Sequence, residues 1–251
     1  MALLGNPNVG KSTLFNAMTG LGVSTAHYPG TTREVQFAET AFGDRRFTVA
    51  DLPGAYSLYT DTEESWVSRR ALLDVRPDVV VVVVDAGNLA RNLKLVLEVL
   101  DLGEPCVVAV NLVDEAQRAG IGVDVGLLST RLGIRVVQTA ATQGLGLEEL
   151  VAAALEVSEG IGSPAPLYSQ TVESSIRLLA PTARRLEECP YGLTPRALVL
   201  QLLSGAEDFG VFFNESSEGS PLLDLTEVAR RRVAACRQYW LLAPFRTGGS
   251  D

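Results

Sequence analysis

The first 158 residues alternate between short apolar runs and longer amphipathic stretches. Apolar or alternating runs predict strands near residues 2–5, 35–41, 46–51, 79–84, 106–111 and 134–138. Apolar positions spaced by three or four residues predict helices near 11–20, 63–74, 90–102, 124–132 and 146–158. Repeated strand–helix units imply right-handed crossovers, so we predict an α/β fold with a mostly parallel sheet flanked by helices. Residues 35–51, turned at Gly43 and Asp44, read as a hairpin that adds one antiparallel edge strand.

The pattern changes after Gly160. Residues 160–166 are rich in glycine and proline and read as a linker, and strand signals stop beyond them. Amphipathic helices are expected around 172–179, 195–203 and 223–240, with a polar loop at 214–221. We therefore predict two domains, 1–160 and 164–246, of which the second is small and all-α.

Composition narrows the class of protein. The 251 residues are 47% hydrophobic and 20% charged, which is ordinary for a globular protein, and the net charge is −9. No basic stripe is visible, so we expect no nucleic-acid partner. The three cysteines, Cys106, Cys189 and Cys236, follow no zinc-binding spacing. No signal peptide is visible, and the longest apolar run, 79–84, is far short of the ~20 residues of a membrane helix, so this piece is expected to be soluble.

The most informative motif lies between the first strand and the first helix. Residues 5–12 fit the pattern G-x-x-x-x-G-K-[ST] at every fixed position. In this motif backbone N–H groups and the helix N-terminus surround phosphate, Lys11 reaches the β- and γ-phosphates, and the Ser12 hydroxyl binds Mg²⁺. The predicted phosphate-binding residues are Gly5, Asn6, Pro7, Asn8, Val9, Gly10, Lys11, Ser12 and Thr13. The fold is then that of a P-loop NTPase.

Two further motifs follow at the ends of later strands. Asp51 is placed to hold Mg²⁺ through a water, and Gly54 is placed to offer its N–H to a γ-phosphate. Asn111 and Asp114 form N-x-x-D, in which the Asp114 carboxylate accepts hydrogen bonds from guanine N1 and N2 and selects GTP over ATP. Each motif alone also fits an ordinary turn or helix cap. Their order after the phosphate loop favours guanine-nucleotide binding.

These residues resemble an Era-like GTPase of the translation-factor class, and within that class the cytoplasmic part of the ferrous iron transport protein B family. The family has Asn-Pro-Asn in its phosphate loop, as at residues 6–8. Residues 28–34 resemble its first switch and 51–58 its second switch, and 84–93 resemble its signature DASNLERNL. The resemblance is specific over residues 2–158, whereas 164–246 resemble the family's GDI-like helical domain only in pattern.

The resemblance implies further site residues. Its first-switch spacing Gly-x-Thr-x-Glu places Gly30, Thr31 and Thr32 at the nucleotide, with Thr32 on Mg²⁺ together with Ser12 and Asp51. The guanine-backing loop reads Ala140, Ala141 and Thr142 instead of Ser-Ala-Lys, and Leu112 replaces the lysine of many GTPases. Both departures predict nucleotide that binds more weakly and exchanges faster.

The residue after Gly54 is Ala55, where Ras-type enzymes have a water-orienting glutamine. Hydrolysis is therefore expected to be slow or to use another group. In related GTPases an asparagine at the position of Asn8 helps bind K⁺, although an asparagine here also suits a turn. The predicted catalytic residues are Asn8, Lys11, Thr32 and Gly54, with GTP or GDP, Mg²⁺ and K⁺ as bound species.

The function expected from the resemblance is a slow GTPase that couples nucleotide state to ferrous iron transport. Its partners would be a membrane permease domain of the same polypeptide and a second copy of the chain, at the cytoplasmic face of a bacterial inner membrane. One alternative is a soluble assembly GTPase acting on RNA or ribosomes, against which the acidic balance stands. Another is a nucleotide-gated binding module with little hydrolysis, which Ala55 supports.

Overall fold

The structure is a computed structural model that describes residues 1–20, 23–27, 34–59, 62–160, 163, 166–186, 189, 193–205 and 219–235. The chain packs as two compact units. The first comprises residues 1–100 and 104–164, and the second comprises residues 101–103 and 165–251.

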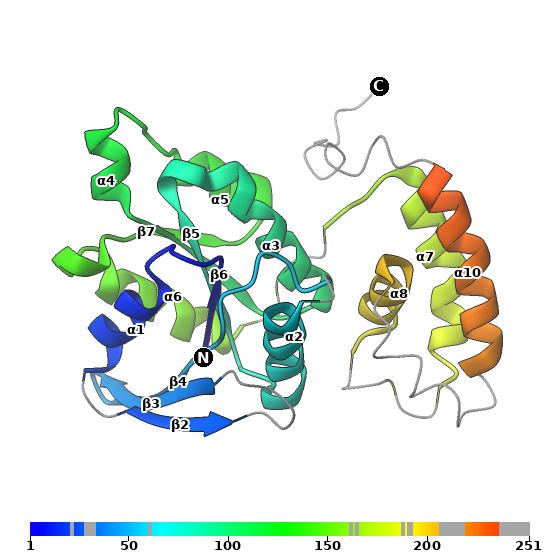
Figure 1. Cartoon of the computed structure of the whole chain (residues 1–251), viewed down its shortest axis with the longest axis horizontal. Coiled ribbons are helices and arrows are strands. Elements are labelled where there is room, and N and C mark those ends of the chain that lie inside the picture. The colour runs from blue at the N-terminus through cyan, green and yellow to red at the C-terminus, as the bar shows by residue number, and fades with distance from the viewer. Residues whose placement is uncertain are drawn as a thin grey trace. The chain divides into compact units, whose positions relative to one another are not determined.

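The first unit is built around one seven-stranded sheet with the order β2-β3-β4-β1-β5-β6-β7 (Figure 1). Among the described strands, β3 pairs antiparallel with β2 and β4 and the other four pairs are parallel, so the predicted mostly parallel sheet is confirmed. The strands are β1 (Ala2–Gly5), β2 (Val23–His27), β3 (Glu34–Phe42), β4 (Arg45–Asp51), β5 (Val80–Asp85), β6 (Cys106–Asn111) and β7 (Arg135–Gln138).

One strand was not predicted, and its presence moves the edge of the sheet. β2 pairs antiparallel with β3, so the first strand of the predicted hairpin lies inside the sheet and β2 forms the edge. The prediction that the hairpin supplies the edge strand was wrong on this point. The β2 sequence, Val-Ser-Thr-Ala-His, has a single large apolar residue, because an edge strand pairs on one side only and needs less apolar surface.

Five predicted helices are present, with ends that differ from the predictions by one residue at most. They are α1 (Lys11–Thr19), α2 (Glu63–Val75), α3 (Leu89–Leu102), α5 (Val125–Leu132) and α6 (Leu147–Ser158). Two 3₁₀ turns, η1 (Ala86–Asn88) and η2 (Ala141–Gln143), and the short helix α4 (Val113–Arg118) were not predicted. A helix of six residues is too short to show a full apolar period in the sequence.

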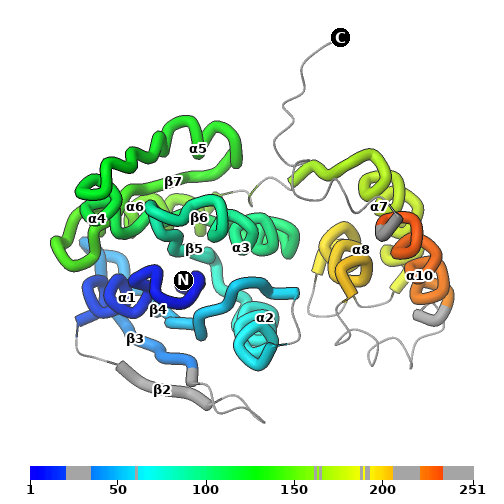
Figure 2. Tube along the Cα trace, turned by 45° about the horizontal axis from the view of Figure 1, so that its top comes forward, coloured from blue at the N-terminus to red at the C-terminus, as the bar shows by residue number. Residues whose placement is uncertain are grey.

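Helices cover both faces of the sheet. One face forms an apolar cluster with α1 and α6, in which Leu14, Phe15 and Leu150 are fully buried. Figure 1 shows α2 and α3 on the opposite side, and Figure 2 shows the same layering from a second direction. The central strand β5 contributes Val80–Val84, each 0% exposed, which explains its unbroken run of valines.

The second unit is helical in its described residues, with α7 (Gln170–Ala183), α8 (Pro195–Ser204) and α10 (Gly219–Ala235) packed on one another. α8 begins where the sequence predicts, because Thr194 caps the N–H of Ala197 at 3.1 Å and Pro195 occupies the first turn. α10 begins at Gly219, so residues 219–221, which were predicted to end the polar loop, belong to the helix instead. Residues 236–240 of the predicted last helix lie outside the described residues.

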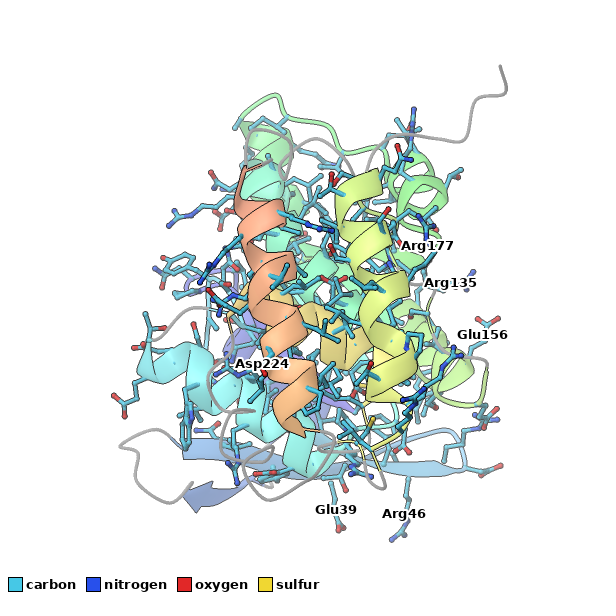
Figure 3. The ribbon with its side chains drawn as sticks, turned by 90° about the vertical axis from the view of Figure 1, so that its right-hand side faces the viewer. Glu39, Arg46, Arg135, Glu156, Arg177 and Asp224 are labelled. Carbon is cyan, nitrogen blue, oxygen red and sulfur yellow. The ribbon has the colours of Figure 1, made fainter. Side chains whose placement is uncertain are left out.

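Charged side chains line the outer surfaces of these elements. Figure 3 shows Glu39 and Arg46 projecting from the β3–β4 hairpin, and Arg135 beside Glu156, with which it forms an ion pair at 3.3 Å. None of the described helices combines the length and the apolar character needed to cross a bilayer.

Candidate nucleotide site

The predicted site residues meet at the carboxyl ends of the parallel strands. β1 ends at Gly5, β4 at Asp51 and β6 at Asn111, and open α/β sheets bind ligands at this edge. A pocket of about 830 Å³ opens there. It is lined by Asn6, Pro7, Asn8, Gly10, Lys11, Ser12, Thr13, Gln36, Asp51, Leu52, Pro53, Gly54 and Glu64.

The loop between β1 and α1 takes a backbone path that suits an anion. Asn8 and Gly10 have positive φ angles of 67° and 80°. A Cβ at Gly10 would lie 2.5 Å from Asn111 Nδ2, so both the left-handed backbone and the close packing require glycine. Gly10 precedes the first turn of α1 and has no side chain to cap it. The N–H groups of that turn are thus left without a side-chain cap, and Gly10, Lys11, Ser12 and Thr13 line the pocket, which suits an anion.

Three charged or polar side chains converge beside this loop. Lys11 Nζ forms an ion pair with Asp51 Oδ1, and Ser12 Oγ donates to Asp51 Oδ2 at 3.0 Å. Lys11 is 9% exposed and Asp51 is 7% exposed. The strand register Leu3↔Asp51 brings these groups together across 40 residues of sequence. The Ser12 hydroxyl and the Asp51 carboxylate supply adjacent oxygen donors, which is the ligand chemistry that Mg²⁺ prefers, so the residues fit a Mg²⁺ ion.

The second switch begins against the phosphate loop. The Ala55 N–H donates to the Gly5 carbonyl at 3.1 Å. A Cβ on Gly54 would lie 3.3 Å from the backbone of Pro7, so the close approach of these two segments favours glycine. The Ala55 side chain is 1% exposed and packs in the core. It makes no contact that would place a water.

The guanine motif is organised by a buried amide. Asn111 is 0% exposed, and its Nδ2 donates to the Val9 carbonyl at 3.0 Å. Its Oδ1 accepts from Thr139 Oγ1 at 3.0 Å and from the Ala141 N–H at 3.2 Å. One side chain thus joins the phosphate loop, the end of β6 and the loop that contains Ala140–Thr142.

Asp114 lies on the first turn of α4 after Leu112, which has a positive φ of 61°. Its Oδ2 accepts from Arg118 Nη2 at 2.7 Å and from Gln143 Nε2 at 3.0 Å. The carboxylate is therefore held in place by its own helix and by the loop after β7. Ala140 is 1% exposed, whereas Thr142 is exposed.

Sequence reasoning missed Leu52 and Pro53 of the pocket lining and Thr139 beside Asn111, as well as Gln36, Glu64, Arg118 and Gln143. Gln36 was deducible, because a two-residue turn at 43–44 pairs Gln36 with Asp51, as the register shows. Arg118 is four residues after Asp114, a spacing that becomes informative only once α4 is known. Glu64 and Gln143 come from other segments, and no local pattern marks them. The predicted residues Gly30, Thr31 and Thr32 lie outside the described residues.

Comparison with known proteins assigns the family. A family model described as ferrous iron transport protein B matches residues 1–154. The Fe(2+) transport protein A/Fe(2+) transporter FeoB fusion protein of Porphyromonas gingivalis is 34% identical over 238 residues, which are 93% of this chain and 28% of that protein. The chain belongs to the ferrous iron transport protein B (FeoB) family.

Solved structures agree with this assignment. A GDP-bound variant of the S. thermophilus FeoB G-domain superposes with a TM-score of 0.80 and 28% identity, over 93% of this chain and 89% of that one. The apo form of the cytosolic domain of the T. maritima FeoB iron transporter gives 0.76 and 30%, over 94% and 96%. The chain spans about a fifth to about a quarter of the length of the curated FeoB relatives it matches.

Proposed function

We propose that residues 1–160 bind GTP and GDP with Mg²⁺ and hydrolyse GTP slowly. The observation that carries the proposal is the convergence of Lys11, Ser12 and Asp51 beside an uncapped helix N-terminus that lines the same pocket. Lys11 would bind the β- and γ-phosphates, and Ser12 and Asp51 would hold Mg²⁺. Asp114, fixed by Arg118 and Gln143, would accept from the guanine base.

The slow rate follows from what the second switch lacks. The buried side chain of Ala55 cannot orient water, so backbone groups of the switches would place it. Charge that builds on the transferred phosphate would be met by Lys11, by Mg²⁺, which neutralises the phosphate oxygens when bound, and by K⁺ near Asn8. Asn8 lines the pocket, in keeping with this role. Thr32 would bind Mg²⁺ only in the triphosphate state, and its release after hydrolysis would free the first switch.

The wider role rests on the family. The FeoB relatives are named as Fe(2+) transporters, and they are several times longer than this chain. We place this chain at the cytoplasmic face of a bacterial inner membrane, where its nucleotide state would regulate a permease domain of the same polypeptide. The residues from 164 to 246 would form the helical domain that responds to the switches, and a homo-oligomer is a further expected assembly.

Nucleotide choice and turnover test the proposal together. Titration with fluorescent GDP should show competition by GTP and none by ATP. GTP turnover should rise when KCl replaces NaCl at constant ionic strength. Asn8→Ala should remove this K⁺ dependence while GDP still binds, and Asn16→Ala, an exposed asparagine on α1, should not.

Each outcome separates one alternative. Equal competition by ATP would contradict the guanine assignment. Binding without turnover in either salt would support the nucleotide-gated binding module instead. Equal rates in both salts would remove K⁺ from the mechanism. The chain has a net charge of −9, and this acidic composition does not favour the alternative of a GTPase that acts on RNA.

A further inference from the structure

Helix α3 carries a carboxylate on the face that it buries. Glu98 is 4% exposed, and its helix neighbours Leu95 and Val99 are each at most 1% exposed. Burial raises the pKa of Glu98, and hydrogen bonds from Ser57 and Leu58, together with the Lys94 ammonium, oppose that rise. A buried carboxylate is costly unless its oxygens are satisfied, so the partners of Glu98 matter.

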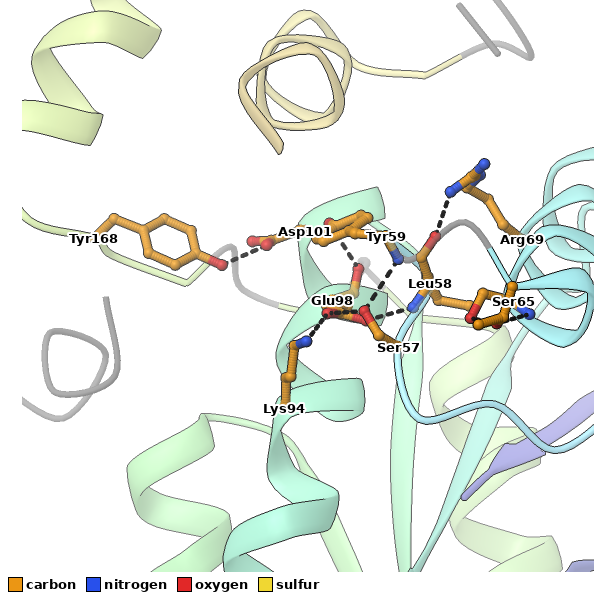
Figure 4. Close-up of polar contacts among 10 residues, drawn as sticks. Ser57, Leu58, Tyr59, Ser65, Arg69, Lys94, Glu98, Asp101 and Tyr168 are labelled. Carbon is orange, nitrogen blue, oxygen red and sulfur yellow. Dashed lines mark hydrogen bonds and ion pairs between the residues drawn. The ribbon is translucent and has the colours of Figure 1, made fainter. Parts of the chain in front are cut away.

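Apart from Lys94 on α3 itself, those partners belong to one short segment, Ser57–Tyr59, that ends the second switch (Figure 4). Ser57 Oγ donates to Glu98 Oε1 at 2.7 Å, and the Leu58 N–H donates to Oε2 at 2.6 Å. The Tyr59 N–H donates to Ser57 Oγ at 3.1 Å. One carboxylate thus holds three successive residues, two directly and one through the Ser57 hydroxyl. Lys94 Nζ lies 3.6 Å away on the exposed side of the helix.

The same segment is anchored at its other end to the phosphate loop. The Ala55 N–H is bonded to the Gly5 carbonyl, and Ser68 Oγ of α2 donates to the Pro53 carbonyl at 2.8 Å. Only Ala55 and Tyr56 separate Gly54 from the residues that Glu98 holds. The contacts of Glu98 therefore begin three residues after Gly54, on the far side of the Ala55 backbone bond.

We propose that Glu98 is a positioning residue for GTP hydrolysis. Its carboxylate fixes Ser57–Tyr59, and through them it sets the Gly54 N–H relative to Lys11 and Asp51. The inference rests on the proposed GTPase function. A position that mattered only for core packing would be served by leucine, which avoids the cost of burying a charge. Leucine here would instead leave the Leu58 N–H and the Ser57 hydroxyl without their acceptor.

The test compares Glu98→Leu, Glu98→Gln and Ser57→Ala with the control Val99→Ala in the full 251-residue chain. Val99 is buried one residue further along α3, and replacing it should loosen the helix packing while the hydrogen bonds to Glu98 remain. For each variant, kcat and KM for GTP, GDP affinity and hydrogen exchange at the Leu58 and Tyr59 amides are measured.

The expected pattern separates positioning from stability. Glu98→Leu should lower kcat about tenfold, with GDP affinity within about twofold, and should speed exchange at Leu58 by about tenfold. Glu98→Gln keeps an acceptor oxygen and should stay within about threefold of the wild-type kcat. Val99→Ala should lower the melting temperature and leave kcat unchanged. Ser57→Ala should lower kcat by about threefold, and it keeps the inference open to refutation if Glu98→Leu does not fold.

Two results would overturn the inference in different ways. If the wild type turns over GTP and both Glu98→Leu and Ser57→Ala match it in kcat and in amide exchange, Glu98 does not position the switch. If the wild type shows no GTP turnover, the proposed function and this inference fail together.

Discussion

The phosphate half and the guanine half of the site are built in different ways. The phosphate half consists of the continuous loop 5–12, whose backbone would bind phosphate, and of one ion pair between Lys11 and Asp51. The guanine half is assembled from three segments that meet on the buried side chain of Asn111. Both halves therefore depend on the packing of the sheet, and the guanine half depends on more separate segments.

The ion pair in the phosphate half gives the largest expected effect. Lys11→Ala leaves the buried Asp51 carboxylate without its cation, which should lower the free energy of unfolding by about 3 kcal/mol or more. It should also weaken GTP binding by roughly 100-fold. Chemical denaturation measures the first effect, and competition of GTP against fluorescent GDP measures the second. Arg46→Ala, which removes an exposed cation from the start of β4, should change either quantity by less than about 0.5 kcal/mol.

Asn111→Ala tests whether one amide joins the two halves. The change leaves the Val9 carbonyl, the Thr139 hydroxyl and the Ala141 N–H without their partner in a buried site. Unfolding free energy should fall by about 2 to 3 kcal/mol, and nucleotide affinity should fall with it. The exposed Asn16→Ala serves as control. A loss confined to base discrimination, with stability intact, would show that the halves are independent.

Asp114→Asn should alter the guanine half alone. An amide can donate to the base, so preference should shift toward xanthosine nucleotides while stability changes little. Gln143→Ala should have a smaller effect, about a threefold loss of GDP affinity with ATP still excluded, because Arg118 continues to hold the carboxylate. Competition titrations with GDP, XDP and ATP measure both variants. Equal damage from the two substitutions would mean that Gln143 contacts the base itself.

The smallest effect on nucleotide binding is expected from Glu104, which lies in neither half. Burial raises the pKa of Glu104 to about 7 against the opposing influence of Arg76. Because the pKa of this carboxyl is higher in the folded chain than in the unfolded chain, the folded chain favours its protonated form. The stability that the protonated carboxyl contributes is therefore present below about pH 4.5 and is lost as pH rises to about 7. Glu104→Gln should therefore raise the melting temperature at pH 8, leave it unchanged near pH 4, and leave GDP affinity unchanged. An equal gain at both pH values would contradict the assigned cause.

Local patterns in the sequence predicted the parallel strands, the five longer helices of the first unit and the order of the three motifs. Each of these depends on contiguous residues, such as the valines of β5 or the Gly5–Ser12 loop. The sequence pattern did not predict β2 or α4, because a short edge strand and a six-residue helix contain too few apolar residues to show a period.

By itself, the sequence determined the fold class, the phosphate loop and the family of this protein, because those features are encoded in runs of neighbouring residues with strong backbone and hydrophobic preferences. Tertiary structure decided which distant side chains meet. It brought Asp51 to Lys11 through strand register, Gln143 to Asp114 through the approach of η2 to α4, and Glu98 to the second switch through the docking of α3. These pairings are separated by 29 to 40 residues, and no local preference specifies them.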